Sequence, residues 1–202
     1  VVAYKEIFDI TDSSAENSIS ATSSAQAEMV GSFVNELQNN GKNIAINKYI
    51  SSYASIMSMS VYDRPYHPLY SEFDYTELYA QNSINSYQQS NSNVELAAIL
   101  DKEGNIVLSS EDCDEYLYIL TENPDRITIA SNNGGISDFI TIKVGGTNTV
   151  AFLVCKDILY EEERVGTFVQ LCTTTQMQKK LFSTKVTNSS TGAVIDAYEN
   201  IL

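Results

Sequence analysis

Residues 96–110 read LAAILDKEGNIVLSS, and this stretch decides how the rest of the chain is interpreted. Two apolar runs, residues 96–100 and 106–108, flank a polar segment that ends in Gly104. Short apolar runs bounded by turn residues predict strands. A type I turn with Gly104 in the left-handed conformation reverses the chain along the natural strand twist. The stretch therefore predicts a β-hairpin in which Asp101 supplies the turn's hydrogen bond and Gly104 its backbone geometry.

Upstream of this hairpin the sequence predicts a long helix. Ser13 and Glu16 form a capping-box pattern, and apolar residues follow at helical spacing from Ala15 to Leu37. The first half of this span carries mainly Ala and Ser, so we expect only the second half to pack on a core. The segment Asn39-Asn40-Gly41 predicts a stop or a kink.

Two shorter helices are expected between the long helix and the hairpin. One covers residues 46–57, and the other runs from a cap at Asp74 or Thr76 to Gln89. Helical spacing places three residues of the latter on its buried face: Ala80, Ile84 and Tyr87. The single histidine, His67, lies in the loop between them without a nucleophile or acid beside it. A surface or packing role is therefore favoured over a catalytic one.

Downstream of the hairpin, an acidic and irregular segment comes before a run of β structure. We expect three antiparallel strands over residues 139–144, 149–157 and 165–174, then a helix over 175–182 and a hairpin over 185–197. Adjacent apolar residues within these strands predict cover on both faces of the sheet. The fold class is therefore α+β.

Composition excludes several classes of partner. The chain has 202 residues, and its 26 acidic residues outnumber its 12 basic ones, giving a formal net charge of −14. Nucleic acids and anionic membrane surfaces attract basic clusters, so neither is an expected partner. One histidine and three cysteines without a C-x-x-C motif argue against a zinc site, and we expect no cofactor.

Cys155 and Cys172 fall inside apolar runs and are expected to be small core residues. A hairpin centred near residues 161–162 places Cys172 opposite about Ala151, which makes a bridge to Cys155 awkward, though the alternative stays open. No run of 18 apolar residues occurs. Because the chain begins at Val1 and ends abruptly at Leu202, we expect it to be part of a longer protein, with any membrane spans outside it.

The order of these features resembles the Cache sensor domains, which are PAS-like extracellular domains of bacterial receptors. Three stretches carry the resemblance over roughly residues 12–182: the D-x-x-G hairpin at 96–110, the strand pair around 155–158 and 164–169, and the long Ser/Ala-rich helix. The resemblance implies a PAS-like antiparallel sheet packed against a long N-terminal helix and shorter helices.

The resemblance also implies a division of the chain. Residues 1–40 would be the long helix, residues 41–182 the sensor domain, and residues 183–202 an extra hairpin or the start of a second lobe.

A sensor of this kind implies a ligand rather than a reaction. The resemblance implies a small-molecule pocket between the sheet and segment 111–138, with candidate ligand-binding residues Tyr116, Tyr118, Arg126, Asn132, Asp138 and Asp157. Arg126 suits a carboxylate, although pairing with Asp125 or a nearby Glu is the plainer interpretation. Both tyrosines suit a pocket wall or a core equally. The resemblance further implies a homodimer through the Ala/Ser-rich stretch 13–28.

The motif of the amino-acid-binding members does not carry over. Those members have an Arg followed by a Trp-Tyr pair and later an Asp, whereas Arg126 is followed by Ile127-Thr128-Ile129 and the chain has no Trp. The turn at 145–148 also lacks the Asp. The identity of the ligand therefore stays open.

Two other functions were weighed. A secreted binding or adhesion module would suit the Ser-, Asn- and Tyr-rich surface. A hydrolase would need paired carboxylates, which only the acidic run at 111–115 supplies, and such runs are usually solvated.

Overall fold

The computed structural model describes residues 2–122, 124–132 and 134–183. The helices are α1 (Val2–Ala45), α2 (Lys48–Met57), α3 (Phe73–Ser90), α4 (Asp114–Glu122), α5 (Pro124–Asn132) and α6 (Thr175–Ser183), with short 3₁₀ turns η1 (Arg64–Tyr66) and η2 (Tyr70–Glu72). The strands are β1 (Val94–Leu100), β2 (Ile106–Ser109), β3 (Ile140–Val144), β4 (Thr147–Tyr160) and β5 (Glu163–Thr173). The hairpin expected over 185–197 lies outside the described residues.

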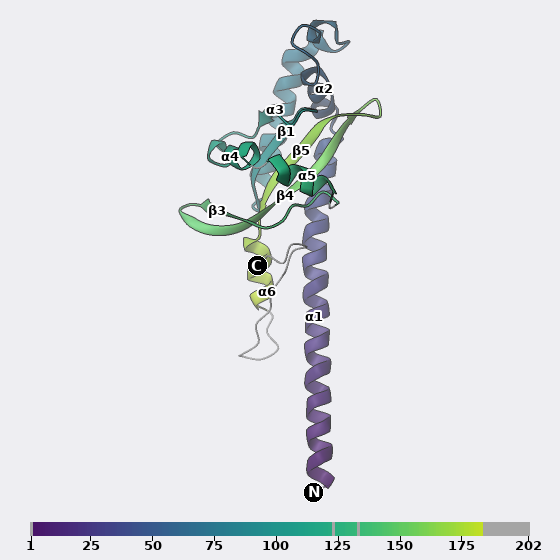
Figure 1. The fold of residues 1–202 in the computed structure, drawn as a ribbon, viewed down its shortest axis with the longest axis vertical. Coiled ribbons are helices and arrows are strands. Elements are labelled where there is room, and N and C mark those ends of the chain that lie inside the picture. Colours follow the sequence, from purple (N-terminus) through teal and green to yellow (C-terminus); the bar gives the residue numbers. More distant parts are fainter. Residues whose placement is uncertain (1, 123, 133, 184–202) are drawn as a thin grey trace.

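The five strands form one antiparallel sheet in the order β2-β1-β5-β4-β3. Helices cover both of its faces, as the apolar strands predict (Figure 1). On one face α1, α2 and α3 pack against side chains such as Phe168, and on the other α4 and α5 pack against side chains such as Val169. These neighbours in β5 point to opposite faces because strand side chains alternate. The predicted α+β class and the PAS-like architecture are confirmed.

The hairpin between β4 and β5 follows the predicted turn with one difference in register. Its turn residues Glu161 and Glu162 have φ values of 50° and 70°. Cys172 pairs with Phe152 rather than Ala151, because the register shifts between Ile158 and Leu159. The prediction was one residue off for this reason. Each of the three cysteines is buried and free, as the core interpretation of Cys155 and Cys172 expects.

Helix α1 does not stop where the sequence indicates. It continues through Asn39-Asn40-Gly41 to Ala45, for 44 residues in total, or about 66 Å at 1.5 Å per residue. The expected stop was wrong because tertiary packing of this stretch against β4 and β5 overrides the local signal. The N-terminal part of α1 projects well beyond the sheet (Figure 1).

The other differences also concern helices. Segment 111–138 was expected to be irregular, but it forms α4 and α5, whose apolar residues face the sheet. Helix α3 has the predicted buried face, yet Glu72 stands at its N-cap without a side-chain bond. Neither Asp74 nor Thr76 is therefore the cap. The division at residues 40 and 182 stays a prediction.

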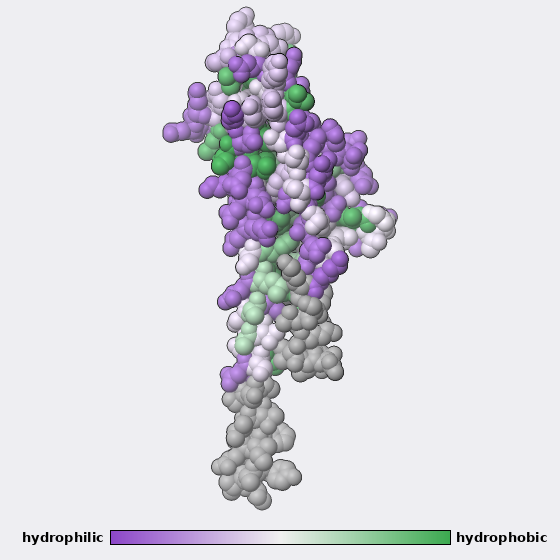
Figure 2. Space-filling model, turned by 180° about the vertical axis from the view of Figure 1, so that it is seen from behind, coloured by the Kyte–Doolittle hydropathy of each residue, from purple (hydrophilic) through white to green (hydrophobic). Residues whose placement is uncertain are grey.

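The surface matches the acidic composition. Figure 2 shows a mostly hydrophilic face with hydrophobic side chains gathered in small patches in the upper half of the molecule. Exposed aromatic residues include Tyr62 and Tyr66, near η1, which are 88% and 83% exposed.

Candidate functional site

A cavity of about 440 Å³ opens on the face of the sheet that α4 and α5 cover. Its walls come from the β1–β2 turn, from α5, and from β4 and β5 near their shared hairpin. The lining combines apolar, hydroxyl and charged side chains: Leu100, Asp101, Lys102, Glu103, Gly104, Pro124, Ile127, Thr128, Ser131, Asp157, Arg164 and Thr167. Small-molecule sites typically pair an apolar wall with a few polar groups in this way.

The β1–β2 turn forms one wall, and a buried carboxylate holds it. Asp101 Oδ1 accepts hydrogen bonds from the backbone N–H groups of Glu103, at 3.0 Å, and Asn105, at 2.8 Å. Its Oδ2 accepts from Asn105 Nδ2 at 2.9 Å. Gly104 has φ of 89°, the left-handed conformation that the sequence predicts. The turn is therefore a rigid edge of the cavity, with both expected roles confirmed.

Arg164 is the cation most firmly placed at the cavity. Its Nε donates to Asp157 Oδ1 at 2.9 Å, and its Nη2 donates to Thr167 Oγ1 at 2.7 Å. Two of the five guanidinium N–H donors are thus used, and the planar group is oriented before a ligand arrives. The side chains of Arg164 and Asp157 are 46% and 57% exposed, so the pair is open to competition from an incoming anion.

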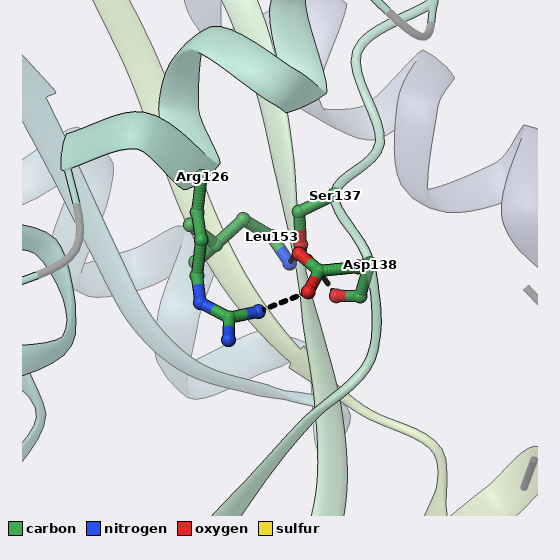
Figure 3. A network of polar contacts seen from close by, with 4 residues as sticks. All are labelled: Arg126, Ser137, Asp138 and Leu153. Atoms are coloured by element: carbon green, nitrogen blue, oxygen red, sulfur yellow. Dashed lines mark hydrogen bonds and ion pairs between the residues drawn. The ribbon is translucent and has the colours of Figure 1, made fainter. Parts of the chain in front are cut away.

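Of the candidate residues from the sequence, Asp157 lines the cavity. Arg126 and Asp138 lie together, joined by an ion pair of 2.6 Å between Nη1 and Oδ2 (Figure 3). This pair ties the start of α5 to the segment before β3, and Asp138 takes the place of the expected partner Asp125. Neither side chain belongs to the cavity lining.

The remaining candidates lie elsewhere. Tyr116 is buried in the core between α4 and the sheet, while Tyr118 is 46% exposed on the other side of α4. Asn132 is exposed at the end of α5. The structure thus brings Arg126 and Asp138 together and separates the others, and a ligand-binding role for each stays a prediction.

Sequence reasoning missed Arg164, Thr167 and the α5 residues of the cavity. A signal for Arg164 was present, because a hairpin near residues 161–162 brings it back beside Asp157. Helix α5 carried a weaker signal, since Ile127 and Ser131 are four residues apart and share a helical face.

The three thiols are free and buried. Burial raises the pKa of Cys155 to about 12 and also raises the pKa of Cys113, so both thiols stay protonated and unreactive. In the part of the chain that the structure describes, no group of three or more His, Cys, Asp or Glu residues could hold a metal ion.

None of the described helices combines the length and apolar character needed to cross a membrane.

No family model matches the chain, and no curated protein matches it. Solved structures do. The sensor domain of the Vibrio cholerae histidine kinase DctB aligns with a TM-score of 0.53 at 11% identity, over 82% of this chain and 58% of that one. The sensory domain of the Campylobacter jejuni chemoreceptor Tlp3 aligns with a TM-score of 0.54 at 11% identity, over 96% of this chain and 72% of that one.

The same Tlp3 domain with isoleucine bound gives a TM-score of 0.52, also at 11% identity, over 96% of this chain and 71% of that one. The chain therefore spans between about half and three quarters of the domains that it matches. These likenesses concern the fold alone, which this chain shares with those sensor domains and which agrees with the PAS-like fold that the sequence resemblance implies.

Proposed function

We propose that this chain is the extracellular ligand-sensing domain of a bacterial membrane receptor, such as a histidine kinase, a diguanylate cyclase or a chemoreceptor. It binds a small molecule and passes the signal through membrane connections at its two ends. The observation that carries the proposal is the cavity, which is built from three separate parts of a sensor-type fold and contains an oriented arginine. A sensory role is thereby favoured over a catalytic one.

The chemistry of the lining favours a ligand with a carboxylate. Arg164 offers a bidentate donor, Lys102 adds a second positive charge, and Leu100 with Ile127 offers an apolar wall. Glu103 and Asp157 supply the opposite charge for an ammonium group on the same molecule. Isoleucine, which is bound in one Tlp3 structure, carries all three features. The six candidate residues from the sequence remain proposals, with Asp157 the one at this cavity.

The hydrolase alternative receives less support. Glu111, Asp112, Asp114 and Glu115 are all exposed and lie outside the cavity lining. Such a run is an ordinary solvated surface. The binding-module alternative has one observation in its favour, the exposed rings of Tyr62 and Tyr66.

A homodimer through α1 accompanies the proposed receptor role. Residues 16–21 of α1 are exposed, including Ile19 at 53%. A helix of this composition gains little stability by itself, because helices depend mainly on packing of an apolar face. Its small side chains would let a second copy approach closely.

The proposal is tested by thermal unfolding against a panel of amino acids, other carboxylates, amines and sugars. We expect a carboxylate class to raise Tm by roughly 5–10 °C at a hundredfold excess over its Kd. Arg164→Met should lose most of this shift, whereas Lys143→Met, which removes a positive charge at an exposed position of β3 outside the cavity, should keep it. A flat response of the wild-type chain across the panel contradicts the proposal.

A further inference from the structure

A polar side chain is buried at the contact between α1 and the middle of the sheet. Gln170 of β5 is fully buried, and its Nε2 donates to the backbone carbonyl of Leu37 in α1 at 2.8 Å. Its Oε1 accepts a hydrogen bond from the hydroxyl of Tyr87 in α3. A buried amide is costly to leave unpaired, so this arrangement favours one placement of α1 over its neighbours.

Gly41 makes this contact sterically feasible. A Cβ at this position would lie 2.7 Å from Gln170 Nε2, which is closer than real Cβ contacts. A slide of α1 by one turn in either direction would bring Leu37 or Ala45 to this place, because residues four apart share a helical face. Either side chain would have to displace Gln170, and the displaced amide would lose its bonds to Leu37 and Tyr87. The packing therefore favours the position of α1 that places Gly41 against Gln170.

Gln38, which follows Leu37 in α1, contacts a second part of the domain. Gln38 Nε2 donates to the backbone carbonyl of Gly134 at 2.8 Å, just beyond the end of α5. The following Gly135 is held from both sides, since its N–H donates to Ala130 in α5 and its carbonyl accepts from Cys155 in β4. Helix α5, a wall of the cavity, is thus connected to α1 through two residues.

Strand β5 forms the other connection. Thr167 lines the cavity on one face of β5, and Gln170 contacts α1 on the opposite face. They are three residues apart, or about 10 Å along the strand. Two of the cavity walls, β5 and α5, therefore reach α1 within the single turn of residues 37–41.

We propose that residues 37–41 of α1, together with Gln170, form a lock that fixes the axial position of α1 against the sheet. Movement of β5 or α5 at the cavity acts on α1 through this lock. Its sensory use rests on the proposed function, but the lock itself exists in the protein without a ligand and is tested there.

The test measures distances between spin labels on Ser24→Cys in α1 and Thr141→Cys in β3, both at exposed positions. The three native cysteines are buried, and burial raises their thiol pKa values, so labelling is selective. Gly41→Ala should shift or broaden the distance distribution by less than one helical turn, about 5 Å, because the added Cβ displaces Gln170 and disrupts the contact that sets the position of α1. Gly31→Ala is the control in the same helix, because a Cβ there meets nothing within 4 Å.

A distribution for folded Gly41→Ala that equals that of Gly31→Ala overturns the lock. If Gly41→Ala does not fold, Tyr87→Phe decides the same question, since it removes one hydroxyl and adds no atom. A broadened distribution supports the lock, and an unchanged one overturns it. Because no ligand is present, failure here leaves the cavity's proposed function standing, and failure of the ligand panel leaves the lock standing.

Discussion

Asp101 is buried although its neighbours Lys102, Glu103 and Gly104 in the turn are exposed. Its carboxylate takes the place of water as the acceptor for backbone and amide N–H groups, and the cost of burying it is offset by these bonds. At the scale of single residues, the buried polar groups are the ones whose replacement has the most specific consequences.

Asp101→Ala should lower the free energy of unfolding by about 2 kcal/mol, because it leaves two turn N–H groups without an acceptor. Lys102→Ala, next to it and exposed, should change it by less than about 0.5 kcal/mol. Urea unfolding monitored by circular dichroism measures both. Equal losses for the two variants would show that the carboxylate does not hold the turn.

His67 should make stability depend on pH. Its Nδ1 accepts from the Leu69 N–H at 3.1 Å, so the neutral ring bears its proton on Nε2, which lies 3.1 Å from Ser55 Oγ. Burial lowers the pKa of His67, and the nearby Glu161 opposes this only in part. Protonation would also place an N–H group at Nδ1, where it would face the Leu69 N–H, so two donors would meet without an acceptor.

Because the folded pKa of His67 lies below that of the unfolded chain, the unfolded state binds more protons between the two values. Stability is then fully present above about pH 6.5, the usual pKa of histidine, and is lost as the pH falls through that window. Urea midpoints of the wild type and His67→Gln, measured from pH 5 to 8, check this. If the stability of His67→Gln falls with pH as much as that of the wild type, the pH dependence comes from other groups.

At the scale of elements, the sequence predicted the helices and strands whose signals lie close together in the chain. The strands and the β1–β2 turn were predictable because apolar alternation and Gly104 act locally. Helices α4 and α5 were missed because charged residues obscure the spacing of Tyr116, Ile119 and Leu120, which face the sheet. The continuation of α1 through Gly41 was hidden because its cause, contact with Gln170, is 129 positions away in the sequence.

Prediction of the candidate site was limited in the same way, because its contacts join residues that only the fold brings together. Asp157 was a candidate by its position in the implied pocket, but its partner Arg164 is identified only once the hairpin is closed. Arg126 was a candidate on the same ground, and its contact with Asp138 depends on how α5 lies on the sheet.

Helix α5 should depend on the Arg126–Asp138 pair more than β4 and β5 depend on Arg164–Asp157. The first pair is 26% and 18% exposed, the second 46% and 57%. Arg126→Met should cost about 1 kcal/mol and retain most of this effect in 1 M salt, whereas Arg164→Met should cost less than about 0.5 kcal/mol. Urea unfolding at low and high salt tests this ranking. Equal costs for Arg126→Met and Arg164→Met would contradict it.

At the scale of the whole molecule, the projecting part of α1 should carry the dimer. We expect the wild type to dimerise at high concentration and Ile19→Lys to weaken this association at least tenfold, because two copies would bring lysines together. Thr141→Lys, an exposed change in β3, is the control. Sedimentation equilibrium measures the constants, and equal association of all three proteins would place any interface elsewhere.

We propose above all that the cavity beside α5 binds a small molecule. Calorimetric titration of the carboxylate that stabilises the wild type most tests it directly, with two variants. Thr128→Trp puts a bulky ring into the cavity, while Thr121→Trp makes the same change at an exposed position of α4 outside the cavity. We expect unchanged affinity in Thr121→Trp and at least a hundredfold weaker binding in Thr128→Trp. Equal affinity in all three proteins would contradict it.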